Sequence, residues 1–352
     1  MNHAKPILKL AAAALALLAC MTAGAQGHEC ARVKDRVERL NCFDKAFGVP
    51  AQNDPVSMAV PPATGEQAST RTLAQAWDLR TDTERRENTK REHDRGTFEL
   101  RAYKPMYLLA ATHTNRINAQ PASQNPANVQ VAPLPIDMNV AQFQISFKTK
   151  VWDKILGDNG SLWMGYTQSS RWQVYNSGAS RPFRETNYEP EAMFVMDTPS
   201  SWGDFLGWRS VMAGVSINHQ SNGRSRPLSR SWNRLIAQWG LEKGDSMILL
   251  RPWWRIPERA ADDDNPRIQD YAGRAEVVFA HRFGGHVVSV QGRHSLRTGD
   301  NARGSMKLEW SIPLSGYLKA HLSLFSGYGE SLIDFNHRQT VVGAGVSLVE
   351  LR

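Results

Sequence analysis

The sequence predicts an all-β fold, a 12-stranded antiparallel transmembrane β-barrel that follows a small N-terminal periplasmic extension. From residue 97 onward, apolar residues alternate with polar or small ones, which is the two-residue period of a β-strand. Twelve such stretches precede the C-terminus, and lengths of about 10–14 residues suit strands that cross a bilayer at a tilt. Short turns and longer loops alternate between them, as a membrane barrel requires.

The expected strands are roughly 97–112, 139–152, 160–174, 185–197, 208–219, 230–242, 246–257, 271–283, 286–297, 303–312, 316–327 and 339–350. The alternation is clearest in 318–324 and 342–348, where every second residue is aliphatic. With a periplasmic N-terminus, the longer loops, which include 220–229 and 258–270, lie on the extracellular side.

The polar strand faces distinguish a membrane barrel from a soluble β-protein. A secreted β-sandwich or a closed soluble barrel needs an apolar interior and a polar surface. Here one strand face carries residues that such a core would exclude: Arg234, Gln238, Glu276, Lys319 and His321. A polar lumen and an apolar outer wall accommodate both faces, so we favour the membrane barrel.

The N-terminus carries the pattern of a secretory signal peptide, which we assign to residues 1–25. Lys5 and Lys9 precede the apolar run 10–21, and small residues follow up to Ala25, where cleavage is expected. A lipoprotein signal that ends before Cys20 is the alternative. No later stretch reaches the roughly 18 apolar residues of a spanning helix. The chain is therefore expected to be exported without a helical anchor.

Residues 26–96 are assigned to an N-terminal periplasmic extension and linker, and residues 97–352 to the barrel. Cys30 and Cys42 would remain after cleavage, and in an oxidising compartment they are expected to form a disulfide within a short helical hairpin over 28–49. The segment 50–70 is rich in proline, alanine and serine and is interpreted as a linker. The segment 71–96 is dense in charge, which favours a solvated helix or tether.

The chain is basic, with a formal net charge of +8. We expect no nucleic-acid partner for an exported protein. Basic loops that face anionic lipid head groups or lipopolysaccharide suit this charge better.

Three polar residues stand out because they occupy the apolar phase of two neighbouring strands. His219 and Ser221 continue the apolar row of 211–217, and Asn233 begins a second row on the next strand. They are the residue types of a base, a nucleophile and a base-orienting group. Polar groups on a lipid-facing wall cost free energy unless they have a partner or a use. The alternative is that they are solvated rim residues just above the hydrocarbon boundary.

Several long blocks resemble the outer-membrane phospholipase A family. The sequence NHQSNGRS at 218–225, followed by SRSWNRL at 229–235, is similar to its active-site signature. Further similar blocks are YTQ at 166–168, PFRETNYEP at 182–190, DDNP at 263–266 and SGYGESLID at 326–334. The resemblance runs from about residue 97 to near the C-terminus. It implies a calcium-dependent, dimer-activated hydrolase of phospholipid acyl esters, of A1/A2 and lysophospholipase type, with its site at the outer leaflet of a Gram-negative outer membrane.

The resemblance also implies roles for individual residues. Ser221 corresponds to the nucleophile, His219 to the general base and Asn233 to the group that holds the imidazole in its reactive tautomer. Gly223 corresponds to the donor of an oxyanion-hole N–H, and a plain turn glycine there is compatible with that role. An asparagine orients the base without adding a charge, which suits a lipid-exposed site.

The calcium ligands implied by the resemblance are the Arg224 carbonyl, the Ser229 hydroxyl and a carbonyl from Ser180 of the partner subunit, so that the homodimer completes the site. Asp264 matches a residue that helps hold calcium in the monomer. Arg226 stands where the family often has an aspartate, and its charge argues against that monomeric site. Gln168, in the lipid-facing phase, matches a residue that hydrogen-bonds across the dimer contact.

Two functions from other classes remain open at this point. A porin-like channel would use the polar lumen, although its charged residues favour a plugged lumen over an open one. A surface adhesin would need more mass than these loops provide.

Overall fold

The computed structural model describes residues 30, 32–47, 72–80, 96–199, 202 and 204–349. The chain divides into two compact units, Met1–Pro62 and Ala63–Arg352. The expected signal peptide and the expected linker, residues 50–70, lie outside the described residues. Among the described residues, no helix combines the length and the apolar character that a membrane crossing requires.

The first unit contains helix α2 (Arg36–Phe47). Its start is capped by Asp35, whose Oδ1 accepts hydrogen bonds from the backbone N–H groups of Val37 and Glu38 at 2.9 and 3.0 Å. Cys30 and Cys42 form a disulfide with a Cα–Cα distance of 5.4 Å. The predicted pairing is confirmed, and α2 is the described part of the expected hairpin.

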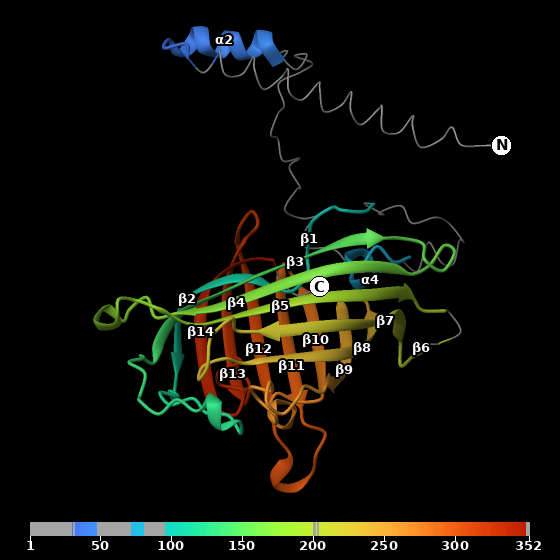
Figure 1. Cartoon of the computed structure of the whole chain (residues 1–352). Helices are drawn as coiled ribbons and strands as arrows, with labels where there is room; N and C mark the ends of the chain where they lie inside the picture. Colours follow the sequence, from blue (N-terminus) through green and yellow to red (C-terminus); the bar gives the residue numbers. More distant parts are fainter. Residues whose placement is uncertain are drawn as a thin grey trace, which may run out of the picture. The chain divides into compact units, whose positions relative to one another are not determined.

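The second unit is a closed antiparallel barrel (Figure 1), which confirms the predicted fold class. Within the described residues its twelve long strands are β2 (Met106–Thr114), β3 (Asn139–Trp152), β4 (Ser161–Trp172), β5 (Phe183–Asp197), β7 (Trp208–Ser221), β8 (Ser231–Lys243), β9 (Ser246–Ile256), β10 (Ala275–Phe283), β11 (His286–His294), β12 (Gly304–Ser315), β13 (Leu318–Gly327) and β14 (Gln339–Val349). Chain neighbours pair in turn, and β14 pairs with β2 to close the sheet.

Shorter elements complete the unit. Two-residue strands pair with the edges of longer ones, β1 (Arg101–Ala102) with β3 and β6 (Asp204–Phe205) with β7. Single turns of 3-10 helix lie in loops: η1 (Pro126–Asn128), η2 (Ser177–Ala179), η4 (Ile268–Asp270) and η5 (Gly299–Asn301).

The first predicted strand, 97–112, is wrong in extent. The structure has β1, then a break over 103–105, and then β2. Pro105 has no N–H to donate to a ladder, and the N–H of Lys104 bonds to the Ser146 hydroxyl at 3.1 Å instead of to a backbone carbonyl. The chain bends at this point, and Tyr103 and Lys104 join the luminal contacts.

The two faces of the sheet differ as predicted. In β7 the exposed Val215 and Ile217, at 51% and 61%, alternate with the buried Ser216 and Asn218, at 2% and 0%. All five charged or polar residues predicted for the lumen are buried: Arg234, Gln238, Glu276, Lys319 and His321. The outer wall is therefore apolar and the middle of the lumen polar, which is the arrangement of a membrane barrel.

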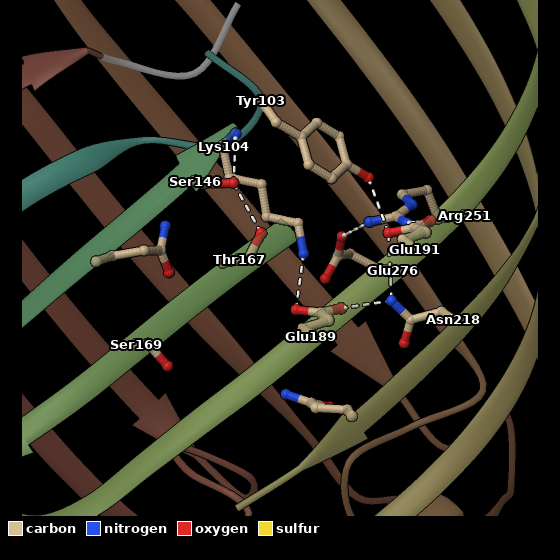
Figure 2. A network of polar contacts seen from close by, with 12 residues as sticks. Tyr103, Lys104, Ser146, Thr167, Ser169, Glu189, Glu191, Asn218, Arg251 and Glu276 are labelled. Carbon is tan, nitrogen blue, oxygen red and sulfur yellow. Dashed lines mark hydrogen bonds and ion pairs between the residues drawn. The ribbon is translucent and has the colours of Figure 1, made fainter. Parts of the chain in front are cut away.

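Charged side chains occupy the middle of the lumen as paired groups (Figure 2). Glu189 accepts hydrogen bonds from Nζ of Lys104 at 2.8 Å and from Nδ2 of Asn218 at 3.0 Å. Glu191 pairs with Arg251 at 2.6 Å. Buried charges are costly unless paired, so this network couples β5, β7 and β9 through their luminal faces.

The segment 72–80 packs inside the barrel, at the end that carries the short turns. Helix α4 (Leu73–Ala76) opens with a reciprocal capping box. Trp77 follows it, is 3% exposed and meets the ring of Trp163 edge-on at 5.4 Å. Nζ of Lys148 lies 3.0 Å from the centre of the Trp77 ring.

The expectation of a solvated tether is therefore wrong for this segment. Leu73, Trp77 and Leu79 are each at most 3% exposed, and the apolar area that they bury outweighs the charge of the flanking sequence. The N–H of Ala74 donates to Oε1 of Glu242 at 2.9 Å, which fastens α4 to β8. The barrel lumen has an apolar core at this end as well as the polar one at its middle.

We expect Trp77→Ala to destabilise the barrel by about 3–5 kcal/mol, because it removes a buried aromatic side chain and leaves a cavity. The midpoint of urea unfolding in detergent micelles measures this. Trp152→Ala is the matched control, since Trp152 is 62% exposed on the outer wall and its loss should cost about 1 kcal/mol or less. Equal losses in the two variants would contradict a packing role for Trp77.

Candidate active site

The hairpin of β7 and β8 brings the three predicted catalytic side chains into one patch. His219 and Asn233 lie directly opposite each other on the two strands, and Ser221 lies opposite Ser231. His219 and Ser221 share the outward phase of β7 with the exposed Ile217. All three candidates therefore lie on the outer wall and not in the lumen.

The imidazole and the amide are hydrogen-bonded. Nδ1 of His219 is 2.8 Å from Oδ1 of Asn233. An amide oxygen can only accept, so this contact places the imidazole proton on Nδ1 and leaves Nε2 free to accept a proton. Nδ2 of Asn233 donates to Oε1 of Glu258 at 2.8 Å. Both halves of the amide thus have partners that match their chemistry.

Ser221 is half-buried at the end of β7, two residues beyond His219 on the same face. Among the hydrogen bonds of the described residues, none joins its hydroxyl to the imidazole. Contacts of this kind are often long before substrate binds and tighten in the enzyme–substrate complex. The structure therefore places the nucleophile candidate and the base candidate two residues apart on one face of β7.

The loop after Ser221 has a fixed conformation. Gly223 has φ +62°, and a Cβ there would lie 3.1 Å from the ring of Tyr188, so glycine is favoured on both counts. The buried Asn222 anchors the loop, because Nδ2 donates to the Leu228 carbonyl at 2.8 Å and Oδ1 accepts from the Arg230 N–H at 3.0 Å. We did not single out Asn222 from the sequence, although an Asn-Gly pair is itself a turn signal.

The predicted calcium ligands are brought together only in part. The Ser229 hydroxyl donates to Oδ2 of Asp264, and Nε of Arg226 lies 3.2 Å from Oδ1 of the same carboxylate. Both oxygens of Asp264 are thus engaged within one chain. Arg224 lies in the same loop as Ser229.

Ser180 lies in a different loop, between β4 and β5. It is exposed and follows η2 in a left-handed conformation, with φ +60°. Carbonyl and hydroxyl oxygens such as those of Ser180, Arg224 and Ser229 suit calcium, which takes hard oxygen ligands. The guanidinium of Arg226 beside Asp264 does not suit a cation held by one chain alone. In the described part of the chain, no cluster of three or more His, Cys, Asp or Glu side chains forms a ready metal site.

Glu258 is a second residue at this site that was not predicted from the sequence. It lies in the loop after β9, with its side chain 19% exposed. Burial raises the pKa of its carboxyl above the ordinary value, Arg255 acts in the opposite direction, and Asp263 adds to the rise. No spacing or motif marked it, because its partner Asn233 lies 25 residues earlier.

Comparisons with known proteins agree with this fold and identify the family. A family model for phospholipase A1 matches residues 83–348. The phospholipase A1 of Klebsiella pneumoniae is 37% identical over 75% of this chain and 87% of its own length, and that of Escherichia coli K12 is 37% identical over 75% and 86%. A protein of Neisseria meningitidis serogroup B is 32% identical over 92% of this chain and 91% of its own length.

Solved structures show the same barrel. Outer membrane phospholipase A from Escherichia coli has a TM-score of 0.63 and 35% identity, over 72% of this chain and 95% of its own. A Salmonella typhi outer membrane phospholipase, described as a dimer with bound calcium, has a TM-score of 0.62 and 34% identity, over 72% and 93%. An active-site variant of the Escherichia coli protein, with an asparagine replaced by alanine, has a TM-score of 0.63 and 36% identity, over 74% and 95%. On this evidence the chain belongs to the outer-membrane phospholipase A family.

Proposed function

We propose that this outer-membrane phospholipase hydrolyses acyl esters of phospholipids in the outer leaflet, with Ser221 as nucleophile, His219 as general base and Asn233 as the group that orients the base. The observation that carries the proposal is the 2.8 Å contact between His219 and Asn233 on the outward face of β7 and β8. A second exposed pair, His113 and Asn139, makes the same 2.8 Å contact across β2 and β3, but no serine stands two residues from that histidine on its strand. The hydroxyl of Ser221 on the same face as His219 is therefore what favours acyl transfer at this pair.

The reaction follows from these positions. Oγ of Ser221 attacks the ester carbonyl carbon while its proton passes to Nε2 of His219. The tetrahedral intermediate expels the lysophospholipid as an alcohol, which takes the proton back from the imidazolium. Water then attacks the acyl-enzyme with the same base, and the fatty acid leaves. Asn233 keeps Nδ1 protonated throughout, so that Nε2 is always the nitrogen that faces the serine.

The surroundings supply an oxyanion donor and an acyl-binding surface. The Gly223 N–H follows Ser221 in the loop, where no side chain blocks its approach to the developing charge. Exposed apolar residues flank the site on the outer wall: Val215, Ile217, Leu235 and Trp254. Acyl chains can lie along this surface while the ester reaches Ser221, so substrate need not leave the membrane.

Calcium and a second copy of the chain would complete the site. The Salmonella relative is described as a dimer with bound calcium. In this chain the Arg224 carbonyl and the Ser229 hydroxyl would bind the ion together with Ser180 of the partner subunit, and the ion would supply positive charge near the oxyanion. Gln168 lies on the outer wall, where its Oε1 accepts a hydrogen bond from the Tyr166 hydroxyl at 3.1 Å and its Nε2 donates to Oγ of Ser170 at 3.5 Å. The second N–H of this amide would meet the partner subunit.

The luminal contacts support the hydrolase over the porin-like channel. The polar network and the segment 72–80 occupy the lumen, and a cavity of about 180 Å³ lies between them in the described part of the chain. A conducting porin needs a continuous aqueous path.

Ser221→Ala should lower kcat for phospholipid by about 10³-fold or more, because it removes the nucleophile. The control is Ser231→Ala, which alters the residue directly opposite on β8 and should leave kcat within about twofold. Fatty-acid release in detergent micelles measures both variants. Full activity in Ser221→Ala would exclude this serine as the nucleophile.

Activity should depend on calcium and on association of two chains. We expect specific activity to fall when the micellar enzyme is diluted below its dimer dissociation constant, and to vanish on chelation and return with added calcium. Titration of specific activity against protein concentration, with crosslinking in parallel, measures this. Constant specific activity over the range in which crosslinked dimer disappears would contradict the dimer requirement.

Arg226→Asp should create a calcium site within one chain, because it removes a cation from Asp264 and adds a second carboxylate. We expect calcium to bind at least about tenfold more tightly, as measured by calorimetry on dilute monomer. Arg338→Asp makes the same charge change at an exposed position in another loop and is the control for a non-specific charge effect. Equal gains in both variants would show that net charge alone is responsible.

A further inference from the structure

Asn233 is held from both sides of its amide. Oδ1 faces Nδ1 of His219, and Nδ2 donates to Oε1 of Glu258, each at 2.8 Å. Asn233 lies opposite Ile256 at the end of β9, and Glu258 follows two residues later in the loop. The three side chains thus form a line from the extracellular loop down to the base.

An asparagine in this position has an ambiguity that an aspartate would not have. A half-turn of its amide exchanges oxygen for nitrogen with almost no change of shape. The turned amide would present N–H to the imidazole, and Nδ1 could then bond to it only by giving up its own proton. The proton would move to Nε2, the nitrogen that must accept from Ser221. One of the two amide orientations is therefore unproductive.

A carboxylate next to the amide removes this ambiguity, because it can only accept hydrogen bonds. We propose that Glu258 is a positioning residue that fixes the amide of Asn233 with its oxygen toward His219, and so sets the tautomer of the base. The proposal rests on the Ser221–His219–Asn233 assignment above. Among the described residues, no hydrogen bond or ion pair joins Glu258 to the imidazole or to Ser221, so its effect would pass through Asn233.

The surroundings of Glu258 hold its carboxylate in place. Nη2 of Arg255 lies 3.8 Å from its Oε2, and the same Nη2 pairs with Asp263 at 2.6 Å. Asn233 belongs to the lipid-facing wall, where a charge is costly, whereas Glu258 lies in the extracellular loop. The arrangement keeps the negative charge one hydrogen bond away from the wall and leaves a neutral amide beside the imidazole.

A double-mutant cycle tests the proposal, since coupled residues give non-additive losses. Glu258→Ala should lower kcat by about tenfold and leave KM within about twofold. In the Asn233→Ala background the same change should alter the residual kcat by less than about twofold, because no amide remains to be positioned. The rate at which a long-chain alkylsulfonyl fluoride labels Ser221 should follow the same pattern, and it reports serine activation without turnover.

Two further variants separate orientation from structure. Glu258→Gln retains an oxygen that can accept from Nδ2 of Asn233, but its own N–H groups can also donate to a turned amide, so it should recover only part of the lost kcat. Asp262→Ala alters an exposed carboxylate in the same loop and should have no effect on kcat. Unfolding midpoints of all variants should match that of the wild type.

Several results would overturn the proposal. Equal loss from Glu258→Ala in both backgrounds would mean that Glu258 acts independently of Asn233. A loss confined to KM, or an unchanged kcat, would exclude positioning. If Glu258→Ala does not fold, Glu258→Gln is measured in the wild-type and Asn233→Ala backgrounds instead. A smaller loss of kcat in the Asn233→Ala background would again support the proposal, and an equal loss would overturn it. If only the positioning role of Glu258 is wrong, Ser221→Ala should still be inactive and the proposed function stands. If Ser221→Ala is active, both the proposed function and the role of Glu258 are excluded.

Discussion

Backbone hydrogen bonding inside a bilayer is the constraint on which the rest of this structure depends. Lipid offers no partner for an unpaired N–H or C=O group, so a spanning sheet must have no free edge. Pairing of β14 with β2 satisfies this condition by closing the barrel. Once the sheet is closed, each residue of a strand faces either lipid or lumen, and its parity along the strand decides which.

Parity also explains where the site lies. His219 and Ser221 follow Ile217 in steps of two along β7. The orientation of the strand that points Ile217 toward lipid therefore points both of them outward as well. A one-residue shift would have placed them among the luminal charges. The candidate catalytic residues are therefore on the wall that faces lipid, and the closed sheet holds the two strands that carry them at a fixed separation.

The two faces of the sheet treat charged groups differently. In the lumen, buried charges are tolerated because they form ion pairs, as Glu191 does with Arg251. On the wall, a charge would have no such partner, and the site uses a neutral asparagine beside its histidine. The carboxylate that accepts from this asparagine, Glu258, belongs to the loop that follows β9. Packing of Trp77 among luminal side chains adds an apolar core that stiffens the opposite end of the barrel.

Much of this could be predicted from the sequence because the signals are local. Alternation located most strands to within a few residues, whereas the first predicted strand ran through Pro105, where the structure has a break between β1 and β2. The catalytic candidates followed from parity and from a resemblance carried by short contiguous blocks. Strand parity and short contiguous blocks can be recognised without knowing which distant segments of the chain are in contact.

The tertiary structure alone decided the contacts between residues far apart in the chain. Residues 72–80 lie in a charge-dense stretch, and only the shape of the lumen made burial of Trp77 favourable. Arg226 pairs with Asp264, and Asn233 pairs with Glu258. No sequence period or motif predicts that these segments come together. The sequence by itself determined which face each side chain takes, because that depends on the period of two. The folded barrel determined which side chains meet, because that depends on closure and on loop packing.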